Sequence, residues 1–170
     1  NYKAHKLVAE KTEHPLHIGI TEAGTLKRGK VKSAIGIGSL LLEGIGDTMR
    51  VSLTADPVEE VYYAQEILEA AGCRTPKVDL VSCPTCGRTK VELQALTEEV
   101  ERRLSAADIR PGLKVAVMGC VVNGPGEAKE ADFGVAGGTG KGVIFSKGEI
   151  VKTVEEKDIV DELMNAIEGK

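Results

Sequence analysis

The sequence predicts an α/β barrel remnant followed by a separate α+β domain. Residues 1–74 alternate between strand and helix patterns, at a spacing typical of parallel strands joined by crossover helices. Residues 75–170 break this alternation, with one long helix pattern followed by several short strands. The chain of 170 residues is 42% hydrophobic but only 3% aromatic, so Val, Ile, Leu and Ala must build its core. Such aliphatic cores are typical of strands that helices cover.

The first part is expected to begin with a helix and then to alternate strands and helices. Its best-marked helix has Asp56 as N-cap, Pro57 in the first turn and Gly72 at the C-terminal stop. So few βα units cannot close a sheet, and we interpret residues 1–74 as the end of a larger barrel-type domain whose start lies outside this chain. The expected elements are a helix over 2–11, a strand over 15–20, a helix over 30–43, a strand over 48–53 and a helix over 57–71.

The second part, residues 75–170, is expected to combine short strands with two helices. A glycine-rich run over 137–142 does not fit a phosphate-binding P-loop, because Gly142 stands where that motif has Ser or Thr opening a helix. A tight hairpin turn explains this run better. The expected elements are strands over 78–82, 113–118, 132–136, 142–145 and 150–153, and helices over 91–106 and 155–167.

Charge and hydropathy exclude several classes of function. The net charge is −4, and acidic and basic residues are interspersed, so no basic stripe indicates nucleic-acid binding. The longest apolar stretch, around residues 39–42, is far too short to span a bilayer. The first residues are polar and charged, so we expect no signal peptide. A Cys-x-x-Cys pair in such a chain indicates a reducing compartment and metal or redox chemistry.

Three cysteines form the most informative pattern of the sequence. Cys83 and Cys86 share one short loop, and Cys120 follows an intervening helix and strand. Such spacing can bring three thiolates to one metal centre, and soft thiolates without histidine favour an iron–sulfur cluster or zinc. Both loops follow expected parallel strands, whose carboxyl ends usually carry the ligands of α/β sheets. The pattern leaves the fourth ligand open among Cys73, a carboxylate and an exogenous group.

Each feature of this pattern also has a simpler interpretation. Structural zinc is the main alternative for the three thiols, and a redox dithiol would leave Cys120 without a role. Cys73 is expected to be a small packing residue, and Glu127 is by default an ordinary surface carboxylate. The loop glycines are expected to let the backbone approach the metal centre closely. These are Gly119, Gly124 and Gly126.

The two strands of the first part alternate apolar and polar residues, as barrel strands do near their carboxyl ends. Arg50 is expected to point inward as a cation suited to phosphate, with Ser52 as a neighbouring donor and Glu22 at the barrel mouth. A salt-bridged Arg and a loop Glu explain the same residues equally well. The apolar positions are Leu16, Ile18, Ile20, Met49, Val51 and Leu53.

Four segments closely resemble the family of 4-hydroxy-3-methylbut-2-enyl diphosphate synthases, the iron–sulfur enzymes of the non-mevalonate isoprenoid pathway. The resemblance covers essentially the whole chain, but only the C-terminal part of those enzymes. It implies a (β/α)8 barrel end over residues 1–74 and a sulfite/nitrite-reductase-like α+β domain over residues 75–170. The segments read HIGITEAG at 17–24, GIGDTMRVSLT at 44–54, SCPTCGR at 82–88 and VMGCVVNGPGE at 117–127.

The resemblance also implies a cofactor and a set of site residues. It implies a [4Fe-4S] cluster that Cys83, Cys86 and Cys120 hold through their thiolates, with Glu127 on the fourth iron. A carboxylate is a harder and more labile ligand than a thiolate, which suits a position where substrate reacts. The residues implied to act on or bind substrate are Glu22 and Glu127 as catalytic groups and His17, Arg50, Ser52 and Asn123 as substrate contacts.

The implied reaction is the two-electron reductive ring opening and dehydroxylation of 2-C-methyl-D-erythritol 2,4-cyclodiphosphate to 4-hydroxy-3-methylbut-2-enyl diphosphate. Ferredoxin or flavodoxin is the implied electron donor, in the bacterial cytoplasm. The resemblance further implies a head-to-tail homodimer of the full-length enzyme, and we expect this chain alone not to turn substrate over. The alternatives are a zinc-stabilised interaction module and an electron carrier with a fully closed cluster.

Overall fold

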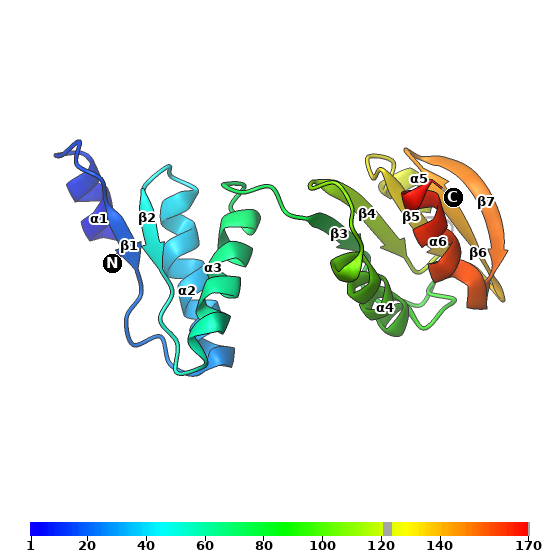
Figure 1. The fold of residues 1–170 in the computed structure, drawn as a ribbon, viewed down its shortest axis with the longest axis horizontal. Coiled ribbons are helices and arrows are strands. Elements are labelled where there is room, and N and C mark those ends of the chain that lie inside the picture. The colour runs from blue at the N-terminus through cyan, green and yellow to red at the C-terminus, as the bar shows by residue number, and fades with distance from the viewer. Residues whose placement is uncertain (121–123, 170) are drawn as a thin grey trace. The chain divides into compact units, whose positions relative to one another are not determined.

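The computed structural model describes residues 1–120 and 124–169, except for the side chains of Pro125 and Glu127. The chain divides into two compact units, Asn1–Pro76 and Lys77–Lys170, which are described one at a time (Figure 1). No helix in the described part of the chain is both long and apolar enough to cross a membrane.

The first unit pairs two short parallel strands and packs helices against them. Ile18 lies opposite Met49 in the strand pair and is fully buried, beside Ile37 and Leu40 of the second helix. This order confirms the strand–helix alternation expected from the sequence, although the described strands form an open pair and no closed barrel. The elements are α1 (Tyr2–Ala9), β1 (His17–Gly19), α2 (Leu26–Leu41), β2 (Thr48–Arg50) and α3 (Pro57–Ala70).

Helix α2 begins at Leu26, four residues before the expected start at Lys30. Gly29 is a poor helix former, but here it is buried, and a Cβ on it would lie 2.3 Å from a methyl carbon of Leu53. Close packing against Leu53 therefore outweighs the low helix propensity of glycine. Helix α3 begins as expected, since the Asp56 carboxylate accepts a hydrogen bond of 2.9 Å from the Val58 amide.

The second unit is built on a mixed sheet of five strands in the order β3-β4-β5-β6-β7. Strands β3, β4 and β5 are parallel, whereas β6 and β7 continue the sheet antiparallel. The expected strands and helices of this unit are confirmed, with boundaries that shift by a few residues. The strands are β3 (Val78–Ser82), β4 (Leu113–Met118), β5 (Phe133–Gly137), β6 (Lys141–Ser146) and β7 (Glu149–Glu155); the helices are α4 (Leu93–Ala106), α5 (Gly124–Glu127), η1 (Glu156–Asp158) and α6 (Ile159–Glu168).

Two buried clusters hold this sheet, one on each face. Helices α4 and α6 cover one face, where Val100 and Leu163 pack with Val115 and Val117 of β4 (Figure 1). On the other face a smaller cluster surrounds Phe145, which is fully buried. The second unit is therefore an α+β layer structure whose core is mostly Val, Leu, Ile and Ala, as the composition predicts, with Phe145 as its one buried aromatic side chain among the described residues.

The glycine-rich run forms a hairpin turn between β5 and β6, as predicted. Gly137 lies opposite Gly142 in the antiparallel ladder, and the Gly138 amide donates to the Lys141 carbonyl at 2.7 Å. Gly140 has a φ of +69°, a conformation that glycine adopts without steric cost.

Candidate metal centre

Both cysteine loops lie at the same edge of the five-stranded sheet. Cys83 follows the last residue of β3, and Cys120 comes two residues after the end of β4. Because β3, β4 and β5 are parallel, their carboxyl ends meet at one edge, where α/β sheets usually bind ligands. The expected placement of the cysteine loops is therefore confirmed.

Gly119 connects the two loops through its backbone. Its amide donates to the Cys83 thiol sulfur at 3.2 Å, and its carbonyl accepts from the Lys90 amide at 3.0 Å. A Cβ on Gly119 would lie only 3.0 Å from the side chain of Thr89 and 3.2 Å from Leu93. Glycine therefore eases the close packing of the two loops here, and its expected approach to a metal centre stays a prediction.

Cys86 sits in a tight turn and carries an activated thiol. Its amide donates to the Thr89 hydroxyl at 3.1 Å, and the Thr89 amide donates back to the Cys86 carbonyl at 3.0 Å. Hydrogen bonds from the Arg88 backbone, and then from its side chain, lower the pKa of the Cys86 thiol below its usual value near 9. These donors favour the thiolate, which is the form that binds metal.

Cys120 lines a cavity of about 370 Å³ at this edge. Its exposed fraction is 7%, whereas Cys83 is half-buried and Cys86 is exposed. The other residues that line the cavity are Gly87, Arg88, Lys90, Gly137, Gly138 and Thr139. The hairpin after β5 thus closes one side of the site, and the first cysteine loop closes another.

The donor set fits a thiolate-bound metal group. Cys83, Cys86 and Cys120 are free thiols on adjoining loops, and backbone amides already hydrogen-bond to sulfur there, as they do around iron–sulfur clusters. Among the side chains that the structure describes, no three of His, Cys, Asp and Glu are gathered closely enough to hold a single metal ion.

Among the other residues singled out in the sequence, one interpretation is wrong and the rest are not tested by the described residues. Cys73 is exposed in the first unit, so its interpretation as a packing residue is wrong: it follows α3 in a turn and has no core to pack against. A Cβ on Gly126 would meet no described atom within 4 Å, and the expected approach of this glycine to a metal centre stays a prediction. Asn123 and the side chain of Glu127 lie outside the described residues.

The barrel-side candidates lie at the ends of β1 and β2. His17 is on β1, and its Nδ1 lies 2.9 Å from the Thr48 hydroxyl on β2. Arg50 is exposed at the end of β2, and Ser52 follows it, half-buried. The predicted alternation is confirmed by Val51, which lies between them and is 4% exposed in the core.

Glu22 has an unusual backbone conformation. It is exposed, comes three residues after β1 and has a φ of +56°, in the left-handed region that residues other than glycine rarely adopt. Such conformations are maintained against a cost of order 1–3 kcal/mol and are frequent at functional sites. The sequence gives no sign of it.

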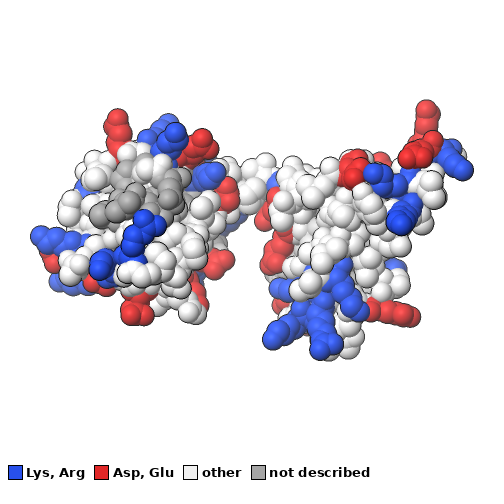
Figure 2. Space-filling view, turned by 180° about the vertical axis from the view of Figure 1, so that it is seen from behind, with Lys and Arg blue, Asp and Glu red and all other residues white. Residues whose placement is uncertain are grey.

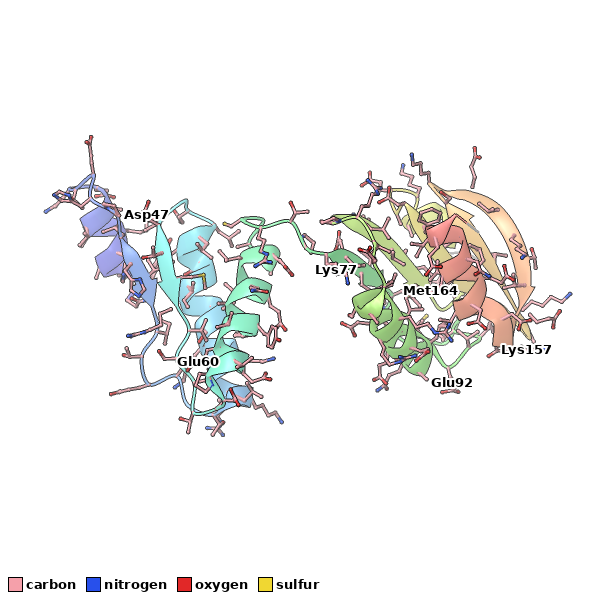
Figure 3. The ribbon with its side chains drawn as sticks, in the orientation of Figure 1. Asp47, Glu60, Lys77, Glu92, Lys157 and Met164 are labelled. Carbon is pink, nitrogen blue, oxygen red and sulfur yellow. The ribbon has the colours of Figure 1, made fainter. Side chains whose placement is uncertain are left out.

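Two carboxylates that the sequence analysis missed fix the chain on either side of the strand pair. Asp47 accepts from the Leu16 amide at 2.7 Å, and Glu60 accepts from the Leu53 amide at 2.7 Å (Figure 3). Both partners are backbone amides, 31 residues away for Asp47 and 7 for Glu60, and a pattern of side-chain types does not reveal bonds to the backbone.

These features define the class of the candidate site: free thiols on two loops at the ligand-binding edge of an α+β sheet. Comparison with protein families then identifies the lineage. Residues 1–65 match the model of the GcpE TIM-barrel domain, and residues 79–169 match the GcpE protein C-terminal domain. The chain therefore belongs to the GcpE family, and its first unit is related to a TIM barrel.

Similar proteins share the name 4-hydroxy-3-methylbut-2-en-1-yl diphosphate synthase (flavodoxin). That of Clostridium perfringens is 58% identical over 166 residues, which cover 98% of this chain and 47% of the relative. That of Caldanaerobacter subterraneus is 60% identical over 166 residues, covering 98% and 46%. That of Geobacter sulfurreducens is 57% identical over 165 residues, covering 97% and 46%. These relatives confirm the resemblance, and the chain spans about half of their length.

Proposed function

We propose that the protein catalyses the reductive ring opening of 2-C-methyl-D-erythritol 2,4-cyclodiphosphate to 4-hydroxy-3-methylbut-2-enyl diphosphate, with residues 75–170 supplying the cluster-binding domain. The observation that carries this proposal is the identity of 58–60% to synthases of that name, across nearly the whole chain. The gathering of both cysteine loops at one sheet edge supports it. Residues 1–74 form the end of the (β/α)8 barrel in this proposal.

Cys83, Cys86 and Cys120 would hold a [4Fe-4S] cluster, with Glu127 as the ligand of the fourth iron. When bound, such a cluster supplies electron transfer and Lewis-acid assistance to the departing oxygen. The chain tunes the ligands through the amide of Gly119, which donates to Cys83, and through the hydrogen bonds of Arg88, which favour the Cys86 thiolate. These hydrogen bonds to the two sulfur atoms are present in the protein without a cluster, and they favour cluster binding in this proposal.

The barrel-side residues bind and orient the substrate in this proposal. Arg50 offers a planar set of donors that suits a diphosphate, and Ser52 adds a neutral donor. His17, oriented by the Thr48 hydroxyl, contacts the same group. Asn123 is assigned a hydrogen bond to substrate.

Glu22 is assigned the delivery of a proton to the hydroxyl group that departs as water. Ring opening breaks a carbon–oxygen bond to phosphate, and dehydroxylation breaks a second carbon–oxygen bond. Counted on neutral formulae, the substrate takes up two electrons and two protons and releases one water. Flavodoxin, which the relatives' names include, is the proposed electron donor, with ferredoxin as the alternative.

From the family resemblance we further propose a sulfite/nitrite-reductase-like topology for the second unit and a cytoplasmic location. We also propose a head-to-tail homodimer, in which the barrel of one subunit faces the cluster domain of the other. Because the chain spans about half of its relatives, we expect it to hold a cluster without forming product on its own.

The first test is the content of iron, zinc and acid-labile sulfide in protein purified without oxygen. We expect about four iron and about four sulfide per chain, as in a cubane cluster. Cys120→Ser should lower both, whereas Cys73→Ser, the same change at the exposed thiol of the first unit, should leave both unchanged.

About one zinc per chain without sulfide, persisting after cluster reconstitution, would instead establish the zinc-stabilised module. Glu127→Cys distinguishes the remaining alternative. A closed electron carrier keeps its electron transfer after this change, whereas the proposed synthase, assayed at full length, loses product formation while retaining iron.

A further inference from the structure

A small basic surface lies beside the proposed cluster. Arg88 and Lys90 are both exposed and both line the cavity of about 370 Å³ that contains Cys120. The other lining residues are glycines and Thr139, so no acidic side chain is among the described lining residues. We call Arg88 and Lys90 the basic rim; basic side chains also stand out on the face of the second unit in Figure 2.

The three thiols differ in their access to solvent, and the accessible one lies on the loop of the basic rim. Cys120 is 7% exposed and Cys83 is half-buried, but Cys86 is exposed. Cys86 also contacts Arg88 directly. Since electrons transfer efficiently only over short distances, a protein that reduces the cluster must approach it where the ligand loop is open. The exposure of Cys86 puts that opening beside the basic rim.

Lys90 is held in place by its backbone and not by its side chain. Its amide donates to the Gly119 carbonyl at 3.0 Å, and its ammonium group forms no ion pair among the described residues. A charge with a fixed backbone position and no ion-pair partner among the described residues is suited to a protein surface of opposite sign. Such rim charges accelerate and orient encounter between proteins.

We propose that the basic rim is the docking surface for an acidic electron-donor protein, which is flavodoxin in the proposed function. This inference rests on that function, because it requires a cluster behind Cys86. The partner is acidic because the described lining of the cavity offers positive charge from Arg88 and Lys90 and no acidic side chain. The docked donor then lies at the exposed end of the ligand loop.

The test is the affinity of purified oxidised flavodoxin for the chain reconstituted with iron and sulfide, measured by titration calorimetry. For the unmodified chain, we expect affinity to fall steeply between low salt and about 0.5 M salt, where screening acts within a few ångströms. Lys90→Glu should weaken binding by about five- to tenfold at low salt. This change leaves the backbone bond to Gly119 in place.

Lys147→Glu is the matched control. Lys147 is exposed, and its substitution by Glu changes the net charge by the same amount as Lys90→Glu. It lies in the turn between β6 and β7, at the opposite edge of the sheet from the cysteine loops. We expect its flavodoxin affinity to stay within about twofold of the unmodified chain. Iron and sulfide content, measured first on each sample, shows that the variants are equally loaded.

Three outcomes would overturn the docking surface. The first is an affinity of the unmodified, loaded chain for flavodoxin that does not change with salt. This outcome can be measured without any variant. The second is equal weakening by Lys90→Glu and Lys147→Glu. The third is a loss of inorganic diphosphate binding in Lys90→Glu with unchanged flavodoxin affinity, which would make the rim a small-anion subsite. Absence of iron and sulfide from the unmodified chain would instead contradict the proposed function itself.

Discussion

Gly119 shows how a single residue can serve both the fold and the metal site. Its amide donates to the Cys83 sulfur, its carbonyl receives the Lys90 amide, and its missing side chain leaves room for Thr89. A Cβ here would press on the side chains of Thr89 and Leu93, which would have to shift by a few tenths of an ångström. Glycine thus spares the loop that carries Cys83 and Cys86 this adjustment.

Gly119→Ala should lower the free energy of unfolding of the metal-free chain by about 1–3 kcal/mol, because its Cβ overpacks against Thr89 and Leu93. It should also reduce iron uptake during reconstitution. Gly87→Ala is the control, since a Cβ there meets no atom within 4 Å. We expect it to stay within about 0.5 kcal/mol in urea unfolding. Equal destabilisation by both substitutions would contradict this account.

At the residue scale, the sequence reveals chemistry better than conformation. The placement of both cysteine loops at one sheet edge was predictable, because each loop follows a short strand of a parallel pair, whereas the ligand role of the thiols stays a prediction. The exposure of Cys73 and the left-handed backbone of Glu22 could not be predicted, because both depend on how a turn lies against the rest of the unit. The hydrogen bonds of Asp47 and Glu60 to backbone amides were not predictable for the same reason.

At the scale of elements, an ionic network joins α4 to α6. Arg103 of α4 bonds both to Glu99 on its own helix and to Asp161 on α6. Arg102 also bonds Glu99. Hydrogen bonds from Arg102 and then Arg103 lower the pKa of Glu99 from its usual value of 4.5 to about 2. The carboxylate is thus more favoured in the folded protein than in the unfolded chain.

The network predicts a loss of stability in acid. Because the folded pKa of Glu99 is depressed, its contribution is fully present above pH 4.5 and is lost as the pH falls towards about 2. Glu99→Gln should be less stable than the unmodified chain at neutral pH, and this difference should vanish near pH 2. Urea unfolding over this range measures it, and added salt should shrink it.

Glu101→Gln is the control on the same helix, since no ion pair of Glu101 is among those of the described residues. Its stability relative to the unmodified chain should vary little with pH. A pH-independent difference for Glu99→Gln would show that packing, and not charge, accounts for the effect.

Element boundaries show where sequence patterns stop being informative. Strands β3 and β4 have the predicted bounds, because each is a short aliphatic run that ends at a cysteine loop. Strands β6 and β7 extend beyond their apolar residues, since ladder hydrogen bonds also hold the polar residues at their ends. Helix α2 starts early because burial of Gly29 overrides its propensity. Tertiary contacts thus decide where β6, β7 and α2 begin or end.

At the scale of the whole molecule, the two units have separate cores. One buried cluster belongs to residues 1–76, two belong to residues 77–170, and none of the described clusters contains residues of both units. The first unit has only two short strands to pack its helices on, whereas the second has a complete five-stranded sheet. We therefore expect the second unit to be more stable than the first when each folds on its own.

We expect the metal-free chain to unfold in two steps, and a chain of residues 77–170 to unfold at the urea concentration of the second step. The shorter chain should also take up as much iron as the full one, because the three thiols and their amide donors lie within it. Circular dichroism and iron analysis check both expectations. A single transition of the full chain, absent from residues 77–170 alone, would contradict independent folding.

The strand order of the second unit also bears on when the site forms. The strands lie in the sheet in the same order as in the chain, so each pairs with the strand made just before it. Contacts between consecutive elements can form during synthesis, as soon as the later strand has been made. The pairing of β4 with β3 brings the cysteine loops together before the hairpin of β5 and β6 closes the cavity beside Cys120. A growing polypeptide thus passes through an open stage, in which cofactor-loading proteins have access to all three thiols.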